Sequence, residues 1–235
     1  ISVEAKDLCP RYLGHAVRNI TFGISPRWMR RRLALCGLRS ISNVVDITNY
    51  VMLEIGQPMH AFDMETLESN QILVRRAREG EPITTLDGKE FTLSPQNLVI
   101  CDGQKPVALA GVMGGLETEV TDATTTILLE TATFQHGRTS RTSRNLGLFS
   151  ESSMRYERGV DDHLCEVVSQ AAAALLAEVS GGTVRPGVVD VYELPTARPE
   201  LIFRIPRFVA MMGADIPADF IEDILVRLGC AVEAT

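Results

Sequence analysis

Glu130 and His60 are the two side chains of this sequence whose settings favour chemistry. Glu130 lies inside the apolar and β-branched run TTTILLETATF, at residues 124–134. An ionised carboxylate is rarely left among apolar neighbours without a partner, because its desolvation is costly. His60 lies near the end of residues 39–63, where polar side chains are threaded among apolar ones. A buried carboxyl group and an imidazole can bind a polar ligand, and an imidazole can also act as a general base.

Both residues also have a structural interpretation. Glu130 would point to solvent if its strand were half-exposed, and a single histidine more often hydrogen-bonds within the fold. A polar side chain buried without a partner costs about 1–3 kcal/mol. A network, within the protein or around a ligand, is therefore expected among Asn43, Asp46, Thr48, Asn49, Tyr50, Gln57 and His60. Whether this stretch forms a helix or a pair of strands stays open.

The glycine-rich string AGVMGG, at residues 110–115, is the third candidate. Gly111, Gly114 and Gly115 would let the backbone approach a ligand and point its N–H groups at it. Such donors stabilise the negative charge that develops on a carbonyl oxygen during hydrolysis. A plain bend between a strand and a loop is the alternative. No Ser-His-Asp or Cys-His arrangement is readable, so we expect no covalent intermediate.

Composition narrows the class of protein. The chain has 235 residues, 45% hydrophobic and 23% charged, which is typical of a globular protein with a sizeable core. No run approaches the roughly 18–20 apolar residues of a membrane span, and we expect no signal peptide and a cytoplasmic location. The five scattered cysteines lack a CxxC pair and the histidines lack ligand spacing, so we expect reduced cysteines and no metal site. The net charge of −7 argues against a stand-alone nucleic-acid binder.

The hydrophobic periodicity predicts an α+β architecture. Ser25 is the expected N-cap, with Pro26 at the first position, of a predicted helix whose buried stripe comprises Met29, Leu33 and Cys36. The opposite face is a solvated charge run, or alternatively a contact for an RNA backbone, made of Arg27, Arg30, Arg31 and Arg32. Strands are predicted on both sides of the Asp87-Gly88 turn and at residues 72–74, 97–101, 107–113 and 124–134. A core helix is predicted at residues 162–180, and two short amphipathic helices follow residue 200.

Several longer strings resemble one known family. VVDITNYV at residues 44–51 and GQPMHAFD at residues 56–63 resemble the signature of the bacterial phenylalanyl-tRNA synthetase β subunit, in its B3/B4 editing module. Further strings match this module in the same order: LDG at 86–88, AGVMGG at 110–115, LLE at 128–130 and RYERGVD at 155–161. The resemblance covers most of residues 7–195. It implies a three-layer α+β domain with a β-sandwich-like core flanked by helices at residues 1–198, and the incomplete start of the small, helical B5 module at residues 199–235.

The resemblance also implies roles for the pocket residues. The family's glutamate that binds the hydroxyl of tyrosine falls on Glu130. Its pocket histidine and asparagine fall on His60 and Asn49, which we expect to position the ester and water rather than to transfer protons. The expected pocket wall comprises Gly111, Val112, Met113, Gly114 and Gly115.

Two positions depart modestly from the family pattern. The family's pocket threonine is replaced by Ser150, which keeps a hydroxyl group, and its alanine is replaced by Ser152, which stays small. These departures bear on selectivity and leave the type of reaction intact. Contacts with the 3′ end of tRNA are expected from Arg39, Arg141 and Arg144.

By this resemblance, we expect the chain to hydrolyse the ester bond of mischarged Tyr-tRNA(Phe) within phenylalanyl-tRNA synthetase. Its expected partners are tRNA(Phe) and the α subunit, in an (αβ)2 heterotetramer, with no membrane. No cofactor is expected in this stretch, and ATP and Mg2+ would be used by the α subunit. The alternative is a non-catalytic module that scaffolds the synthetase or binds tRNA. Another relative with this fold, such as the accessory domain of tRNA(Ile)-lysidine synthetase, is disfavoured by the complete GQPMHAFD match.

Overall fold

The structure of the chain is a computed structural model that describes residues 1–68, 71–103, 105–193, 195 and 200–233. The chain divides into two units, Ile1–Thr196 and Ala197–Thr235. The boundary expected between residues 198 and 199 lies outside the described residues. Within them, no helix is long and apolar enough to span a membrane.

The first unit is built around a central antiparallel sheet. Its strands follow the order β11-β2-β10-β3, and β12 also pairs with β2. Their bounds are Thr183–Val184 for β11, Arg11–Arg18 for β2, Thr126–Thr133 for β10, Met59–Asp63 for β3 and Val189–Val191 for β12. The strand predicted from TTTILLETATF is confirmed as β10, which is paired along both edges and almost entirely buried.

A second sheet packs on one face of the central sheet. Its order is β1-β4-β7-β8-β9. The bounds are Ser2–Val3, Ile72–Arg76, Leu98–Asp102, Lys105–Leu109 and Met113–Gly114. The predicted hairpin at Asp87-Gly88 is confirmed by β5 (Pro82–Thr84) and β6 (Glu90–Thr92), and a short 3-10 helix, η1, spans Leu116–Thr118. The apolar core between the two sheets includes Tyr12, Phe62, Val74, Ile100 and Ala108.

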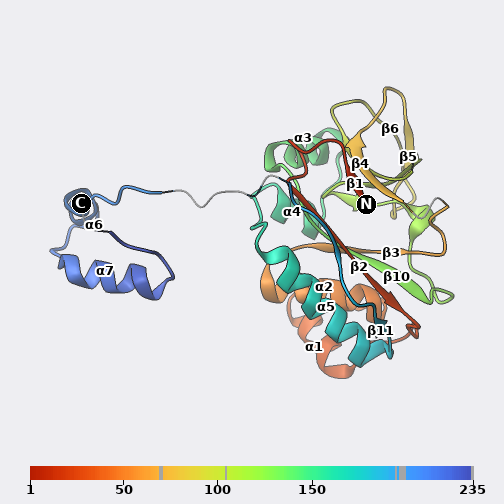
Figure 1. Cartoon of the computed structure of the whole chain (residues 1–235), viewed down its shortest axis with the longest axis horizontal. Helices are drawn as coiled ribbons and strands as arrows, with labels where there is room; N and C mark the ends of the chain where they lie inside the picture. Colours follow the sequence, from red (N-terminus) through yellow and green to blue (C-terminus); the bar gives the residue numbers. More distant parts are fainter. Residues whose placement is uncertain (69–70, 104, 194, 196–199, 234–235) are drawn as a thin grey trace. The chain divides into compact units, whose positions relative to one another are not determined.

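Helices cover the other face of the central sheet. These are α1 (Arg27–Leu35), α2 (Asn43–Ile55) and α5 (Leu164–Ser180), as Figure 1 shows below the strands β2, β3 and β10. A second core, with Leu33, Ile47, Leu129 and Val168, joins them to the sheet. Two shorter helices, α3 (His136–Leu146) and α4 (Glu151–Tyr156), lie in sequence between β10 and α5. Helices, central sheet and second sheet make three layers, which confirms the predicted α+β class.

Residues 39–63, whose element was open from the sequence, form α2 followed by β3. Ser42 caps α2 and accepts a hydrogen bond from the amide of Val45, and Gly56 ends the helix with a φ of 94°. The buried carboxylate of Asp46 accepts hydrogen bonds from Ser25, Ser40 and the amide of Ile41. Ser25 therefore donates a hydrogen bond to Asp46 of α2 and does not cap α1 as predicted. The polar residues at the start of α2 form a network within the protein.

The second unit contains α6 (Ile205–Met212) and α7 (Ala218–Arg227) within its described residues. Both predicted short helices are therefore present, and Gly213 ends the first of them. The side chains of this unit are mostly exposed, and Ile221 is the buried one on these two helices.

Of the cysteines in the chain, Cys36 and Cys230 are exposed, so the prediction that Cys36 packs in the core is wrong.

Candidate active site

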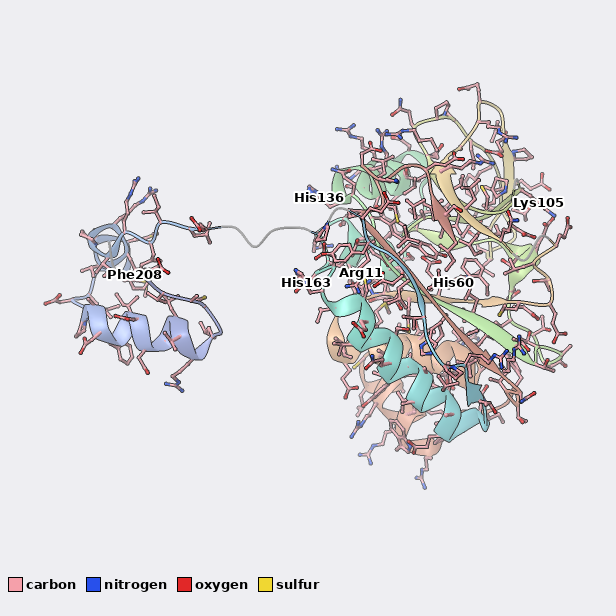
Figure 2. All side chains as sticks on the ribbon, viewed as in Figure 1. Arg11, His60, Lys105, His136, His163 and Phe208 are labelled. Carbon is pink, nitrogen blue, oxygen red and sulfur yellow. The ribbon has the colours of Figure 1, made fainter. Side chains whose placement is uncertain are left out.

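Strand pairing brings His60 and Glu130 together. In the central sheet, Glu130 of β10 lies directly opposite His60 of β3 on one side and Gly14 of β2 on the other. Directly opposite residues of an antiparallel pair project from the same face of the sheet, about 5 Å apart. His60 is labelled in Figure 2, where β3 runs beside β10. The two side chains singled out by the sequence therefore belong to one site.

The site is a small cavity between the two sheets, of about 50 Å³. This volume accommodates a few water molecules. Seven of the residues predicted from the sequence line it: His60, Gly111, Val112, Met113, Gly114, Glu130 and Ser152. Residues of the apolar core complete the lining. The lining comprises Pro58, Met59, His60, Ile100, Ala108, Leu109, Gly111, Val112, Met113, Gly114, Glu130, Ser152 and Tyr156.

Glu130 presents a buried carboxyl group to this cavity. The residue is 4% exposed, and no described residue gives its Oε2 atom a hydrogen-bond partner. Burial raises the pKa of Glu130 to about 8, because it disfavours the charged carboxylate. The nearby hydroxyl of Tyr12 offsets part of this increase, although the pair lacks hydrogen-bond geometry. At pH 7 Glu130 is therefore mainly a neutral acid that can both donate and accept a hydrogen bond.

His60 is a neutral imidazole in the same wall. Burial lowers the pKa of His60 to about 4, because it disfavours the imidazolium. Its Nε2 atom is buried and has no hydrogen-bond partner among the described residues. The ring packs edge-on against Phe62, with 4.5 Å between the ring centroids. An imidazole with so low a pKa is a weak base, so it is better suited to orienting a polar ligand than to removing a proton.

The glycine loop forms the opposite wall and lies against His60. A Cβ atom on Gly114 would lie 2.6 Å from Cε1 and 2.9 Å from Nε2 of His60, so only glycine allows this approach. Gly111 has a φ of 70°, and a Cβ atom there would lie 2.9 Å from the ring of Phe134. The backbone between them carries Val112 and Met113 into the cavity lining.

Ser150 holds this loop in place from outside the cavity. Its hydroxyl caps α4 by accepting a hydrogen bond from the amide of Ser153 and donates one to the carbonyl of Val112, at 2.7 Å. Ser152, the second residue of the same helix, lines the cavity. The two serines therefore have different positions. Ser150 holds the loop that forms the cavity wall, and Ser152 can contact a bound ligand directly.

Gln57 and Tyr156 fix the start of β3 against β10. The Nε2 atom of Gln57 donates to the carbonyl of Ala132 at 2.8 Å, and the hydroxyl of Tyr156 donates to the same carbonyl at 3.0 Å. Gln57 donates its second N–H to the carbonyl of Pro58 at 3.1 Å, and the single proton of the Tyr156 hydroxyl is shared between Ala132 and this carbonyl, which lies 3.2 Å away. These bonds hold the chain between α2 and β3 in the register that places His60 opposite Glu130.

Several predicted residues lie away from the cavity lining. Asn49 is a half-buried residue of α2, and Ser150 acts through the loop. The amide of Gly115 donates to the carbonyl of Val107 at 2.8 Å, so it is not available to a ligand. Arg141 and Arg144 are exposed on α3, whereas Arg39 is exposed in the connection between α1 and α2. Figure 1 shows α3 at the opposite end of this unit from α1 and α2. The structure does not gather the three arginines into one surface.

Sequence reasoning missed Tyr12 as a neighbour of Glu130. Tyr12 lies two residues from Gly14 in β2, and it is fully buried beside the carboxyl group. Nothing in the sequence paired RYLGHAVR with β10, so no signal pointed to Tyr12.

Among the described residues, a group able to hold a cation, Asp161, Asp162 and His163, lies outside the cavity lining.

Comparison with known proteins identifies the family of this chain. The B3/4 domain family matches residues 8–181. The chain is 47% identical over 234 residues to the phenylalanine–tRNA ligase beta subunit of Nitratidesulfovibrio vulgaris, covering 100% of this chain and 29% of that protein. It is 48% identical over 228 residues to that of Geobacter sulfurreducens, covering 97% of this chain and 28% of that protein. The chain thus spans less than a third of the length of these curated relatives.

A solved structure shares the fold. The crystal structure of an N-terminal fragment of the phenylalanyl-tRNA synthetase beta subunit from Pyrococcus horikoshii matches with a TM-score of 0.51 and 12% identity, over 95% of this chain and 62% of that one. At this identity the match concerns the fold alone. The family match covers well over half of the residues, and the relatives align along nearly the whole chain. The chain therefore belongs to the B3/4 domain family, in the form that occurs within phenylalanine–tRNA ligase beta subunits.

Proposed function

We propose that this chain is the editing part of a phenylalanine–tRNA ligase beta subunit, which hydrolyses the ester bond of mischarged Tyr-tRNA(Phe). One observation carries the proposal: Glu130 offers a buried carboxyl oxygen without a partner to a cavity that also holds His60. A buried polar atom left unpaired is costly, and it is retained where a ligand supplies the missing bond. The phenolic hydroxyl of tyrosine is a ligand of this kind.

Selectivity would arise from the hydroxyl that distinguishes tyrosine from phenylalanine. An apolar pocket rejects the extra hydroxyl only weakly, whereas a site built to bond it rejects the analogue that lacks it. Neutral Glu130 can donate to the phenol oxygen or accept its proton in a hydrogen bond. Phenylalanine would leave the carboxyl group unpaired, at a cost of about 1–3 kcal/mol.

Hydrolysis would rely on orientation rather than on a strong base. An aminoacyl ester is already labile, so holding water near its carbonyl carbon lowers the barrier. The buried Nε2 of His60 can hydrogen-bond the water or the ester, and the backbone of residues 111–114 borders the same space. The cavity is smaller than the roughly 150 Å³ that encloses a benzene ring, so binding of a tyrosine ring requires its lining to open further.

The remaining assignments concern the larger enzyme. We propose that tRNA(Phe) and the α subunit are its partners in an (αβ)2 assembly, with ATP and Mg2+ used by the α subunit. Arg39, Arg141 and Arg144 stay proposed contacts for tRNA, and Asn49 a proposed positioning residue. Residues 199–235 are proposed as the start of the B5 module.

Deacylation of Tyr-tRNA(Phe) by the intact ligase tests the proposal. We expect Glu130→Ala and His60→Ala each to slow deacylation about tenfold or more, which is the effect of losing roughly 1.4 kcal/mol. Glu90→Ala, at an exposed glutamate of β6, is the matched control and should leave the rate unchanged. An unaltered enzyme that deacylates Tyr-tRNA(Phe) no faster than the solvent reaction would overturn editing and favour the non-catalytic scaffold.

A further inference from the structure

Helix α1 exposes a cluster of arginines whose side chains bond to nothing in the described residues. Arg27, Arg30 and Arg31 are exposed, and no ion pair or side-chain hydrogen bond holds them. The buried side of the same helix is made by Met29 and Leu33. Figure 1 shows α1 at the outer edge of the helix layer, and it packs against α2. The three arginines therefore face solvent from one side of the domain.

Their positions do not stabilise the helix. The first turn of α1 carries Arg27 and Arg30 and no acidic residue, although the amino end of a helix favours negative charge. Arg27 and Arg31 are four residues apart, so their like charges repel each other along the helix. The chain as a whole has a net charge of −7, so this is a local concentration of positive charge. A cluster that costs folding energy and pairs with nothing internal indicates a use outside the fold.

An exposed tryptophan lies beside the arginines on a rigid support. Trp28 is 40% exposed, and its ring meets that of Tyr50 edge-on, with 5.3 Å between the centroids. The guanidinium of Arg32 lies 5.4 Å from the ring of Trp28 and donates a hydrogen bond to the hydroxyl of Tyr50. That hydroxyl donates in turn to Glu54 at 3.0 Å. Arg32 is thus used within the protein, whereas Trp28 keeps an open surface.

We propose that the α1 surface, defined as Arg27, Trp28, Arg30 and Arg31, binds the sugar-phosphate backbone of RNA, with an unpaired base or a ribose against Trp28. Guanidinium groups bind phosphate oxygens in a bidentate manner, and this surface uses arginine without lysine. Aromatic side chains stack on exposed bases of RNA. A polyanion with flat bases matches both the charge and the aromatic ring of this surface.

The inference rests on the proposed function only for the identity of the RNA, which would be the tRNA whose ester enters the cavity. The α1 surface belongs to the helix layer, and Glu130 projects from the other face of the central sheet, since its neighbour Leu129 packs with the helices. It would therefore contribute to the affinity for tRNA and leave the chemical step unchanged.

The single tryptophan of the chain provides the test. A tRNA(Phe) transcript is titrated into the protein at several salt concentrations while Trp28 fluorescence is recorded. We expect the RNA to change this fluorescence, and the triple variant Arg27→Gln/Arg30→Gln/Arg31→Gln to bind about tenfold more weakly. Each lost phosphate contact should lower the slope of log K against log salt by about 0.7–0.9. The control removes three exposed arginines elsewhere, Arg76→Gln/Arg78→Gln/Arg158→Gln, two of which form ion pairs, with Asp7 and Glu157, and it should bind as the unaltered chain does.

Three results would overturn the inference: no binding of tRNA by the unaltered chain at about 50 mM salt, no change in Trp28 fluorescence on binding, or equal losses in the two triple variants. An acidic protein surface, which would also use the exposed Ile24 and Leu35, predicts the first or second of these. Deacylation rates measured over a range of Tyr-tRNA(Phe) concentrations separate this inference from the proposed function. The α1 triple variant should raise KM and keep kcat, whereas an enzyme that binds tRNA through α1 without deacylating it would refute only the editing proposal.

Discussion

His60 and Glu130 lie directly opposite each other on the neighbouring antiparallel strands β3 and β10. No hydrogen bond joins them among the described contacts, and each keeps a buried atom without a partner. Burial shifts the pKa values of the two groups in opposite directions, to about 8 for Glu130 and about 4 for His60. Both are therefore mainly neutral at pH 7. A neutral pair of this kind can bind an uncharged polar ligand without an ion to compensate.

Glu130 makes the stability of the fold fall as the pH rises. Its pKa is about 8 in the folded chain against 4.5 for an unperturbed glutamate. Between these values the folded state holds one proton more than the unfolded state, so each pH unit costs up to about 1.4 kcal/mol of unfolding free energy. Glu130→Gln should remove this dependence. Urea unfolding of both proteins between pH 6.5 and 8.5 measures it, and identical slopes would contradict the buried position of the carboxyl group.

His60 has the opposite effect at lower pH. Its pKa falls from 6.5 to about 4 on folding, so between these values the unfolded state holds one proton more than the folded state. The fold should therefore lose stability as the pH drops from 6.5 to 4. In the unaltered chain this loss is largely cancelled above pH 4.5 by the effect of Glu130, but it should appear in Glu130→Gln. The double variant Glu130→Gln/His60→Gln is the control, and its unfolding free energy should be flatter over this range.

Gly114→Ala should displace the ring of His60. The added methyl group would lie 2.6 Å from the imidazole, which is closer than any real contact, so the ring or the loop must shift. We expect a loss of about 1–3 kcal/mol in stability and of at least tenfold in Tyr-tRNA(Phe) deacylation. Gly23→Ala is the matched control, because a methyl group there meets nothing within 4 Å. A shift of the His60 Cε1–H resonance only in Gly114→Ala would locate the effect.

Ser150→Ala should loosen the glycine loop without altering the cavity lining. The substitution removes the cap of α4 and the bond to the carbonyl of Val112, with an expected loss of about 0.5–2 kcal/mol in stability. Deacylation of Tyr-tRNA(Phe) should decrease because the wall opposite His60 is less well held. Ser150→Thr keeps the hydroxyl group and should restore both properties. Thermal unfolding and deacylation are measured together, and an unchanged Ser150→Ala enzyme would separate this serine from the site.

The sequence predicted the elements of the fold better than their pairing. The β-branched run around Glu130 forms β10, and the two hairpin strands and the core helix form where periodicity placed them. The position of Tyr12 beside Glu130 depends on β2, which is more than one hundred residues away in sequence and lies antiparallel to β10. Local pattern carries no information on such long-range register.

The residues of the candidate site were also predicted unevenly. His60, Glu130 and the loop from Gly111 to Gly114 line one cavity. They could be expected to lie together only from the family resemblance, because local sequence pattern does not show which distant residues meet. Gly115 was expected to offer its amide to a ligand, but that amide completes a hydrogen bond to Val107 in the second sheet. Backbone donors of this kind are assigned by strand pairing, which single residue types do not reveal.

Strand β10 is held along both edges, whereas β9, which carries Gly114, is a two-residue strand at the margin of its sheet. The carboxyl group of Glu130 thus lies on a strand paired on both sides, whereas the facing wall includes a short strand paired on one side. The group proposed to recognise the ligand and the loop that borders its entrance therefore belong to different sheets. If the proposed role of Glu130 holds, substitutions in residues 111–114 should change which molecules enter the cavity and keep the selection for a hydroxyl group.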